Sequence, residues 1–122
     1  EEFNYDNFDD LIYLDEDGFR VVQLVLEVTR RKNEQGQKEP KEKFLQRIKN
    51  SGSRKAKLLK CADRISNLTD LNSDFDKDFI NRYLVESRDY VMPMAKEVNQ
   101  NMYVELKDRI INLEEATGME IL

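Results

Sequence analysis

The stretch from Arg54 to Leu71 constrains the fold most, because it is the longest run with apolar residues at helical spacing. Ser53 precedes it and can cap a helix, since its hydroxyl can accept a hydrogen bond from an unpaired backbone N–H. The apolar residues recur three and four positions apart, which predicts one buried stripe. The predicted members of this stripe are Leu58, Cys61, Ala62, Ile65 and Leu68. The chain is therefore expected to organise around one central helix.

A second row of residues runs beside the stripe. Leu59, Asp63 and Asn67 follow one another at spacings of four, so their side chains should stack along the helix. A carboxylate next to an apolar face needs a partner, because an unpaired buried charge is costly. The partner can be an arginine or lysine from elsewhere in the chain, or it can be a metal ion. The spacing alone leaves both open.

Composition narrows the class of protein. A chain of 122 residues is expected to form one domain, residues 1–122. The net charge of −5 argues against a nucleic-acid polymer as partner, since phosphate binding needs an excess of lysine and arginine. No apolar run approaches the ~20 residues of a membrane span. The single cysteine, Cys61, is expected to be a small core residue and fits a cytoplasmic location.

The remaining periodic segments predict an all-α fold of five or six helices. The predicted helices cover residues 7–13, 17–32, 41–50, 54–71, 77–98 and 100–116. Pro93 removes a backbone donor inside the fifth of these, which predicts a kink or break near Asp89 and Tyr90. The predicted packing residues of that helix are Phe79, Ile80, Tyr83, Leu84, Tyr90, Val91 and Ala95. Residues 33–40 are expected to form a loop, and residues 119–122 a frayed tail.

The segment Lys60–Leu71 resembles the "K-x-A-D-[RK]-x-x-N-[LM]-x-x-L" helix of HD-domain phosphohydrolases. Within that superfamily it is most similar to the RelA/SpoT-type hydrolases, which remove pyrophosphate from the 3′ position of guanosine tetraphosphate (ppGpp). Three further segments resemble family motifs in the same order: Phe19–Thr29, Tyr90–Ala95 and Glu105–Asp108. Together the four segments span most of the chain. The resemblance implies an HD-domain-like helical bundle, incomplete at its N-terminus.

The resemblance also implies roles for particular residues. Asp63 matches a family aspartate that binds a divalent ion, often Mn²⁺, a metal that suits carboxylate and imidazole ligands. Such an ion would lower the pKa of a bound water and orient it on phosphorus. Asn67 matches a residue that contacts the nucleotide, although it can also satisfy its own helical turn. Tyr83 matches a tyrosine that faces the substrate, although a core aromatic fits its position equally well.

The chain departs from the family pattern in two places. Ser66 stands where relatives often have His or Tyr before the asparagine. The sequence contains no histidine at all, so the metal-binding histidines and the paired aspartate would belong to helices upstream of Glu1. The chain is thus expected to be the C-terminal two-thirds of such a domain, to bind metal poorly and to be inactive alone. Glu1 and Glu2 match an acidic pair that helps activate water, or are two solvated residues.

Two functions follow as hypotheses. The first is an HD-type, metal-dependent phosphohydrolase acting on ppGpp or its pentaphosphate, a nucleotide substrate of the guanosine polyphosphate class. The second is a non-catalytic helical module, either regulatory or for protein interaction, related to HD domains by degeneration. In that second case the missing helices would leave apolar surface exposed, and a second copy of the chain in a homo-oligomer could bury it.

Overall fold

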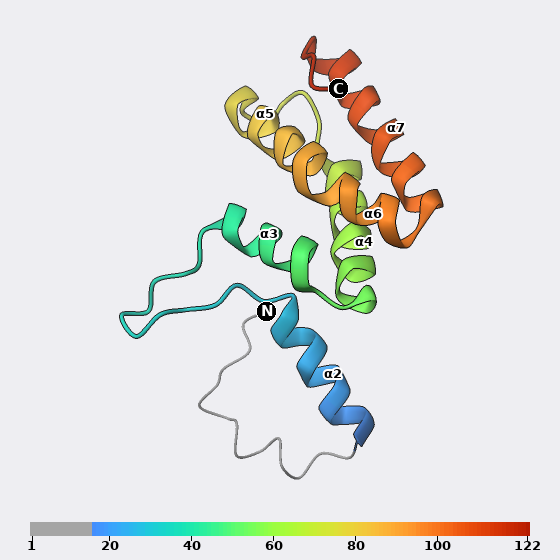
Figure 1. The fold of residues 1–122 in the computed structure, drawn as a ribbon. Helices are drawn as coiled ribbons and strands as arrows, with labels where there is room; N and C mark the ends of the chain where they lie inside the picture. Colours follow the sequence, from blue (N-terminus) through green and yellow to red (C-terminus); the bar gives the residue numbers. More distant parts are fainter. Residues whose placement is uncertain (1–15) are drawn as a thin grey trace.

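The computed structural model describes residues 16–122, and these form an all-α fold, as the sequence predicts (Figure 1). The predicted helix at 7–13 lies outside the described residues. The described elements are α2 (Glu16–Glu27), α3 (Lys41–Ser51), α4 (Arg54–Asp70), α5 (Lys77–Glu86), the π-helix η2 (Ser87–Val91), α6 (Met92–Val98) and α7 (Gln100–Thr117). No helix in this range is both long and apolar enough to cross a membrane.

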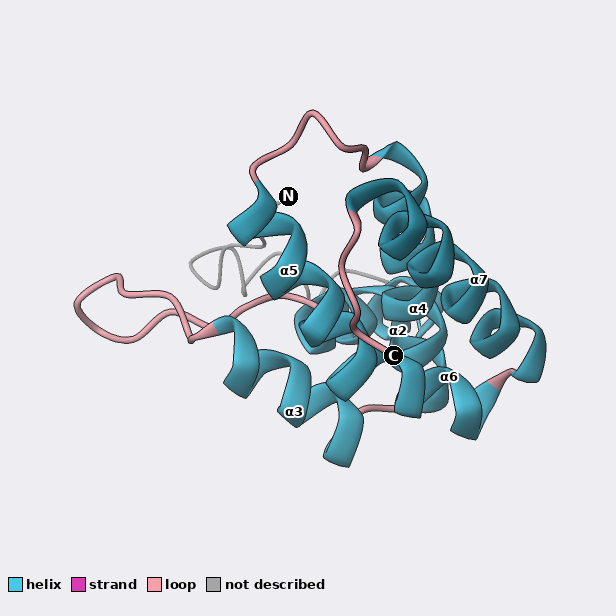
Figure 2. Ribbon diagram, turned by 90° about the horizontal axis from the view of Figure 1, so that it is seen from above, coloured by secondary structure: helices cyan, strands magenta, loops and turns pink. Residues whose placement is uncertain are grey.

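Helix α4 is the centre of the fold, because it contacts α2, α3, η2, α6 and α7. In Figure 1 it runs through the middle of the molecule, with α7 alongside it and the α5–α6 rod crossing it; Figure 2 shows the same arrangement from above. The Ser53 hydroxyl accepts a hydrogen bond from the Ala56 N–H at 3.1 Å, which confirms the predicted N-cap. The central helix therefore begins where the sequence indicates.

The buried face of α4 is rotated from the predicted stripe. The buried residues of α4 are Ala56, Lys57, Cys61, Arg64 and Leu68. Leu58 and Ile65 are only half-buried, and Ala62 is exposed, so its assignment to the core was wrong. Helices α6 and α7 and the π-helix η2 contact α4, and Arg64 on the buried face bonds Glu86 and Ser87 where α5 meets η2. Apolar spacing alone did not identify this face, since two of its members are charged.

Cys61 is a core residue, as predicted. Its side chain is fully buried, and its thiol lies 3.8 Å from the Val91 carbonyl oxygen as a weak donor. Burial raises the pKa of the Cys61 thiol to about 11. The group therefore stays protonated at neutral pH and packs as a small apolar side chain.

Helix α2 is shorter than its sequence pattern indicates, ending at Glu27 instead of continuing to Lys32. The backbone beyond it turns back on itself. The Glu39 N–H donates to the Arg31 carbonyl at 2.7 Å, and Lys32 forms an antiparallel bridge with Lys38. A residue whose backbone pairs with an extended segment cannot also have the backbone conformation of a helix. The segment after α2 is therefore a loop, which Figure 1 shows projecting from the bundle.

The predicted interruption before Pro93 is present. The α-helical pattern gives way to the π-helix η2, in which the Met92 N–H donates to the Ser87 carbonyl five residues earlier. Pro93 has no N–H and its ring crowds the preceding turn, so a widened turn relieves the conflict. Downstream, Gly118 ends α7 with φ of +74°, a conformation that glycine adopts at no steric cost.

The end of the chain is packed against the bundle, so the prediction of a frayed tail was wrong. Ile121 is buried, and its N–H donates to the Glu114 carboxylate at 2.7 Å. The Leu122 N–H reaches the same oxygen at 3.3 Å, and Arg88 donates to the Ile121 carbonyl at 2.9 Å. Glu114 therefore anchors the tail, a role that no local pattern indicates.

We expect Glu114→Ala to release this tail. Removing the acceptor of two backbone N–H groups should lower the free energy of unfolding by about 1–2 kcal/mol. It should also speed amide hydrogen exchange at Ile121. Glu115→Ala, at the exposed neighbouring position, is the matched control and should change neither quantity. Unchanged exchange at Ile121 in Glu114→Ala would contradict the anchoring role.

Candidate functional site

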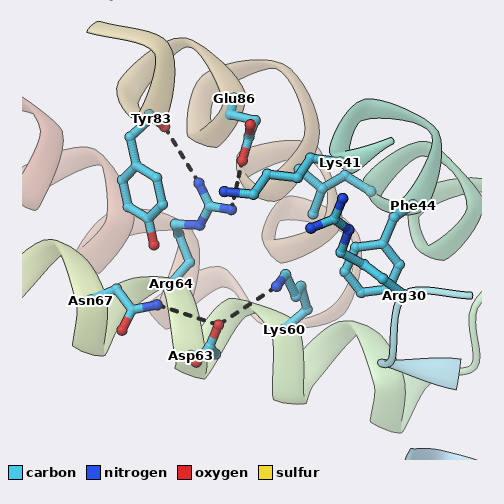
Figure 3. A pocket seen from close by; sticks show the side chains of 10 residues that line it. Arg30, Lys41, Phe44, Lys60, Asp63, Arg64, Asn67, Tyr83 and Glu86 are labelled. Atoms are coloured by element: carbon cyan, nitrogen blue, oxygen red, sulfur yellow. Dashed lines mark hydrogen bonds and ion pairs between the residues drawn. The ribbon is translucent and has the colours of Figure 1, made fainter. Parts of the chain in front are cut away.

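A pocket of about 170 Å³ lies between α3, α4 and α5 (Figure 3). Helix α3 supplies Lys41, Phe44 and Leu45, helix α4 supplies Lys60, Asp63, Arg64 and Asn67, helix α5 supplies Tyr83 and Glu86, and the loop after α2 supplies Arg30. The three helices follow one another in the sequence, but the cavity forms only where their packing brings these side chains together.

Three of the predicted site residues meet at this pocket. Asp63, Asn67 and Tyr83 all line it, and Figure 3 shows Asn67 and Asp63 along one side of α4 with Tyr83 facing them from α5. Tyr83 is half-buried, and burial raises the pKa of its phenol. Glu1 and Glu2 lie outside the described residues. Of the row predicted on α4, Asp63 and Asn67 therefore border a cavity, whereas Leu59 does not line it.

The Asp63 carboxylate has only weak partners. Oδ2 lies 3.6 Å from the Lys60 ammonium and accepts a long hydrogen bond of 3.5 Å from Asn67. Within the described residues, no hydrogen bond reaches Oδ1. The side chain is 53% exposed, and the neighbouring Arg64 turns to a different carboxylate. Asp63 is thus held at the edge of the pocket without being locked in a strong ion pair.

Arg64 is the principal site residue that our sequence reasoning missed. Its side chain is 4% exposed, and Nη2 donates to Glu86 at 3.0 Å. Nη1 donates to the Ser87 hydroxyl at 3.2 Å and approaches the Tyr83 carbonyl at 3.4 Å. A signal was available, because Arg64 falls three residues after Cys61 and four before Leu68, in line with two buried positions. From the sequence we assigned Arg64 no role.

Arg64 also forms one wall of the pocket. Its guanidinium carbon lies 4.0 Å from the centre of the Tyr83 ring, a cation–π contact that fixes the ring's position. Nε is buried and has no hydrogen-bond partner among the described residues. An unmade hydrogen bond of this kind is costly, so the remaining contacts must compensate. The arginine is therefore a strongly held, strongly positive component of the wall.

The pocket is electropositive although the chain is acidic. Four cationic side chains line it, Arg30, Lys41, Lys60 and Arg64, against the two carboxylates Asp63 and Glu86. The net charge of the whole chain is −5. Burial lowers the pKa of Lys60, and the neighbouring charge of Arg64 lowers it further. A bound anion would relieve this repulsion, which makes the pocket suited to phosphate groups.

The described residues do not complete a metal site. Within residues 16–122 no group of three or more His, Cys, Asp or Glu side chains lies close enough together to hold an ion. Asp63 offers one carboxylate at the pocket, and Glu86 is engaged by Arg64. Catalytic metal centres commonly take three ligands from the protein. Any ion bound at Asp63 would need further ligands from outside the described residues.

Comparison with known proteins gives no family assignment: no family model matches the chain, and no curated protein matches it. The resemblance to HD-domain phosphohydrolases therefore stays a prediction that rests on the motifs themselves.

We expect Arg64→Met to destabilise the fold by about 2–4 kcal/mol in urea unfolding, because it leaves Glu86 inside the protein without its cation. Arg82→Met, an exposed arginine on α5, is the control and should change stability little. The double variant Arg64→Met/Glu86→Leu should recover part of the loss, since neither charge is then unpaired. An Arg64→Met protein as stable as Arg82→Met would show that the buried pair contributes little.

Proposed function

We propose that this chain is the C-terminal part of an HD-domain, metal-dependent phosphohydrolase of the RelA/SpoT type, which removes the 3′-pyrophosphate from ppGpp or pppGpp. One observation supports this above all: Asp63 and Asn67, the two motif residues with implied site roles on α4, border an electropositive pocket. An aspartate outside such a cavity, or one held in an ion pair with Arg64, could not bind a metal ion beside the substrate.

The chemistry of the lining favours a phosphorylated ligand. Guanidinium and ammonium groups form charge-assisted hydrogen bonds with phosphate oxygens, and these are stronger than neutral ones. The cavity volume of about 170 Å³ is smaller than pockets that enclose whole drug-sized ligands, typically about 300–1,000 Å³. It accommodates phosphate groups, with the remainder of the ligand lying outside. The substrate class proposed here has that form, since ppGpp carries two diphosphates on one nucleoside.

In this proposal Asp63 is the metal ligand that the chain contributes, and Asn67 contacts the nucleotide. The ion, held by Asp63 and by ligands from a segment upstream of Glu1, would supply an acidic bound water as nucleophile. The cations of the pocket hold the phosphates and neutralise their charge. Tyr83, positioned by its contact with Arg64, forms the opposite wall.

A longer protein that begins upstream of Glu1 should hydrolyse ppGpp in the presence of Mn²⁺, and Asp63→Ala should abolish this activity. The reason is that the variant loses a ligand of the metal. Pyrophosphate release measures the reaction. Asp70→Ala removes an exposed carboxylate from the same helix and should leave the rate unchanged. Full activity in Asp63→Ala would disprove the metal role.

The 122-residue chain should itself bind inorganic pyrophosphate, and Lys41→Gln should weaken this binding about 5- to 10-fold in calorimetry, because a charged hydrogen-bond donor is lost. The affinity of the unsubstituted chain should fall as salt is added, since salt screens the attraction. Lys55→Gln, an exposed lysine on α4 outside the pocket, is the control. Equal weakening by both substitutions would indicate a general charge effect instead of a site.

The non-catalytic module remains the second candidate, and α2 provides the observation in its favour. Helix α2 has no buried residue, and it exposes Phe19 at 42% and Val21 at 60%. Apolar groups of this kind suit contact with another surface. A longer protein that binds ppGpp but does not hydrolyse it would favour this second function.

A further inference from the structure

An exposed row of aromatic rings leads away from the pocket along α5. Phe75, Phe79 and Tyr83 are spaced four residues apart, and each ring stacks on the next, with centroids 6.4 Å and 5.6 Å apart. Phe75 is 46% exposed and Phe79 37% exposed. Tyr83 belongs both to this aromatic row and to the pocket wall (Figure 3).

The aromatic row is held in place by the start of α5. The Asp76 carboxylate accepts from the backbone N–H groups of Asp78 at 2.7 Å and Phe79 at 3.4 Å, capping the helix. Before the cap, the Asn72 side chain accepts from the Asp74 N–H at 2.9 Å and the Asn72 carbonyl accepts from the Phe75 N–H at 3.2 Å. The two phenylalanines therefore need little reordering to receive a ligand.

The core does not account for the position of these rings. Phe79 was predicted to be a packing residue, and that prediction was wrong; the buried residues of α5 are Ile80 and Leu84, which were predicted with it. Exposed large aromatic side chains gain considerable free energy when another ring covers them. Phe79 stays 37% exposed although Phe75 and Tyr83 lie on either side of it, and a flat, apolar group placed against that exposed part would take up the gain.

We propose that the aromatic row is the stacking platform for the base of a nucleotide whose phosphates occupy the electropositive pocket. This inference rests on the proposed phosphate-binding role of that pocket. Its ground is continuity: the row begins at Tyr83, whose ring contacts the Arg64 guanidinium on the pocket side and Phe79 along α5. The pocket has room for phosphates and little else, so the nucleoside must lie along a neighbouring surface.

Stacking of this kind does not distinguish one base from another, because every base has a π-face. The aromatic row would therefore separate nucleotides from base-free phosphates, but it would not separate guanine from adenine. Any preference for guanine would come from hydrogen bonds elsewhere, with Asn67 beside Tyr83 the available amide in the lining.

The test compares GTP, ATP and inorganic triphosphate as probes for the 122-residue chain and its Phe79→Leu variant. Leucine keeps the apolar character and removes the ring. Phe79→Leu should bind both nucleotides about 5- to 100-fold more weakly, the range expected for loss of one stacked base. Triphosphate should bind both proteins equally. In NMR spectra the purine H8 proton should shift upfield on binding to the unsubstituted chain, and the variant should reduce this shift.

Phe19→Leu is the matched control, because Phe19 on α2 is 42% exposed against 37% for Phe79, and this variant should bind all three probes as the unsubstituted chain does. The inference is overturned if triphosphate binds but Phe79→Leu leaves nucleotide affinity and the H8 shift unchanged; the phosphate pocket would then still stand. If neither nucleotides nor triphosphate bind, the phosphate pocket itself is refuted and the stacking platform with it.

Discussion

The buried guanidinium of Arg64 is the interaction on which the site depends. It joins the central helix to the junction of α5 and η2 through Glu86 and Ser87, and it fixes the Tyr83 ring by direct contact. A buried ion pair is often no more stabilising than an apolar contact of the same size, because both charges lose hydration. Here the ion pair sets the spacing between α4 and α5, and this spacing forms the pocket.

The clustered cations of the pocket destabilise the folded chain by repulsion, but the same charges attract an anionic ligand. Four cations gathered around one cavity repel one another; burial lowers the pKa of Lys60, and the charge of Arg64 lowers it further. Lys60 also lies over the Phe44 ring, 5.2 Å from its centre, and this cation–π contact offsets part of the repulsion. A bound anion would offset more of the repulsion among the pocket cations. A phosphate ligand would therefore stabilise the fold as it binds, by mass action on the folded state.

Features that depend on a few neighbouring residues were predicted correctly. Ser53 caps its helix, and Pro93 interrupts its own, because each effect acts within one or two turns. Features that depend on distant partners were missed. The exposure of Phe79 and the contact of Arg88 with the Ile121 carbonyl both depend on how separate elements pack, and helical spacing does not encode which elements meet.

The sequence by itself determined the all-α class, the Ser53 cap and the row of Asp63 and Asn67 on one helix face, since these follow from local hydrogen bonding and from the helical period. Only the tertiary structure decided that this row borders a cavity, that Arg64 is buried and that the lining is positive. The physical reason is that burial and electric potential are sums over groups distant in sequence. An acidic chain can thus enclose a basic pocket, which its composition gives no means of foreseeing.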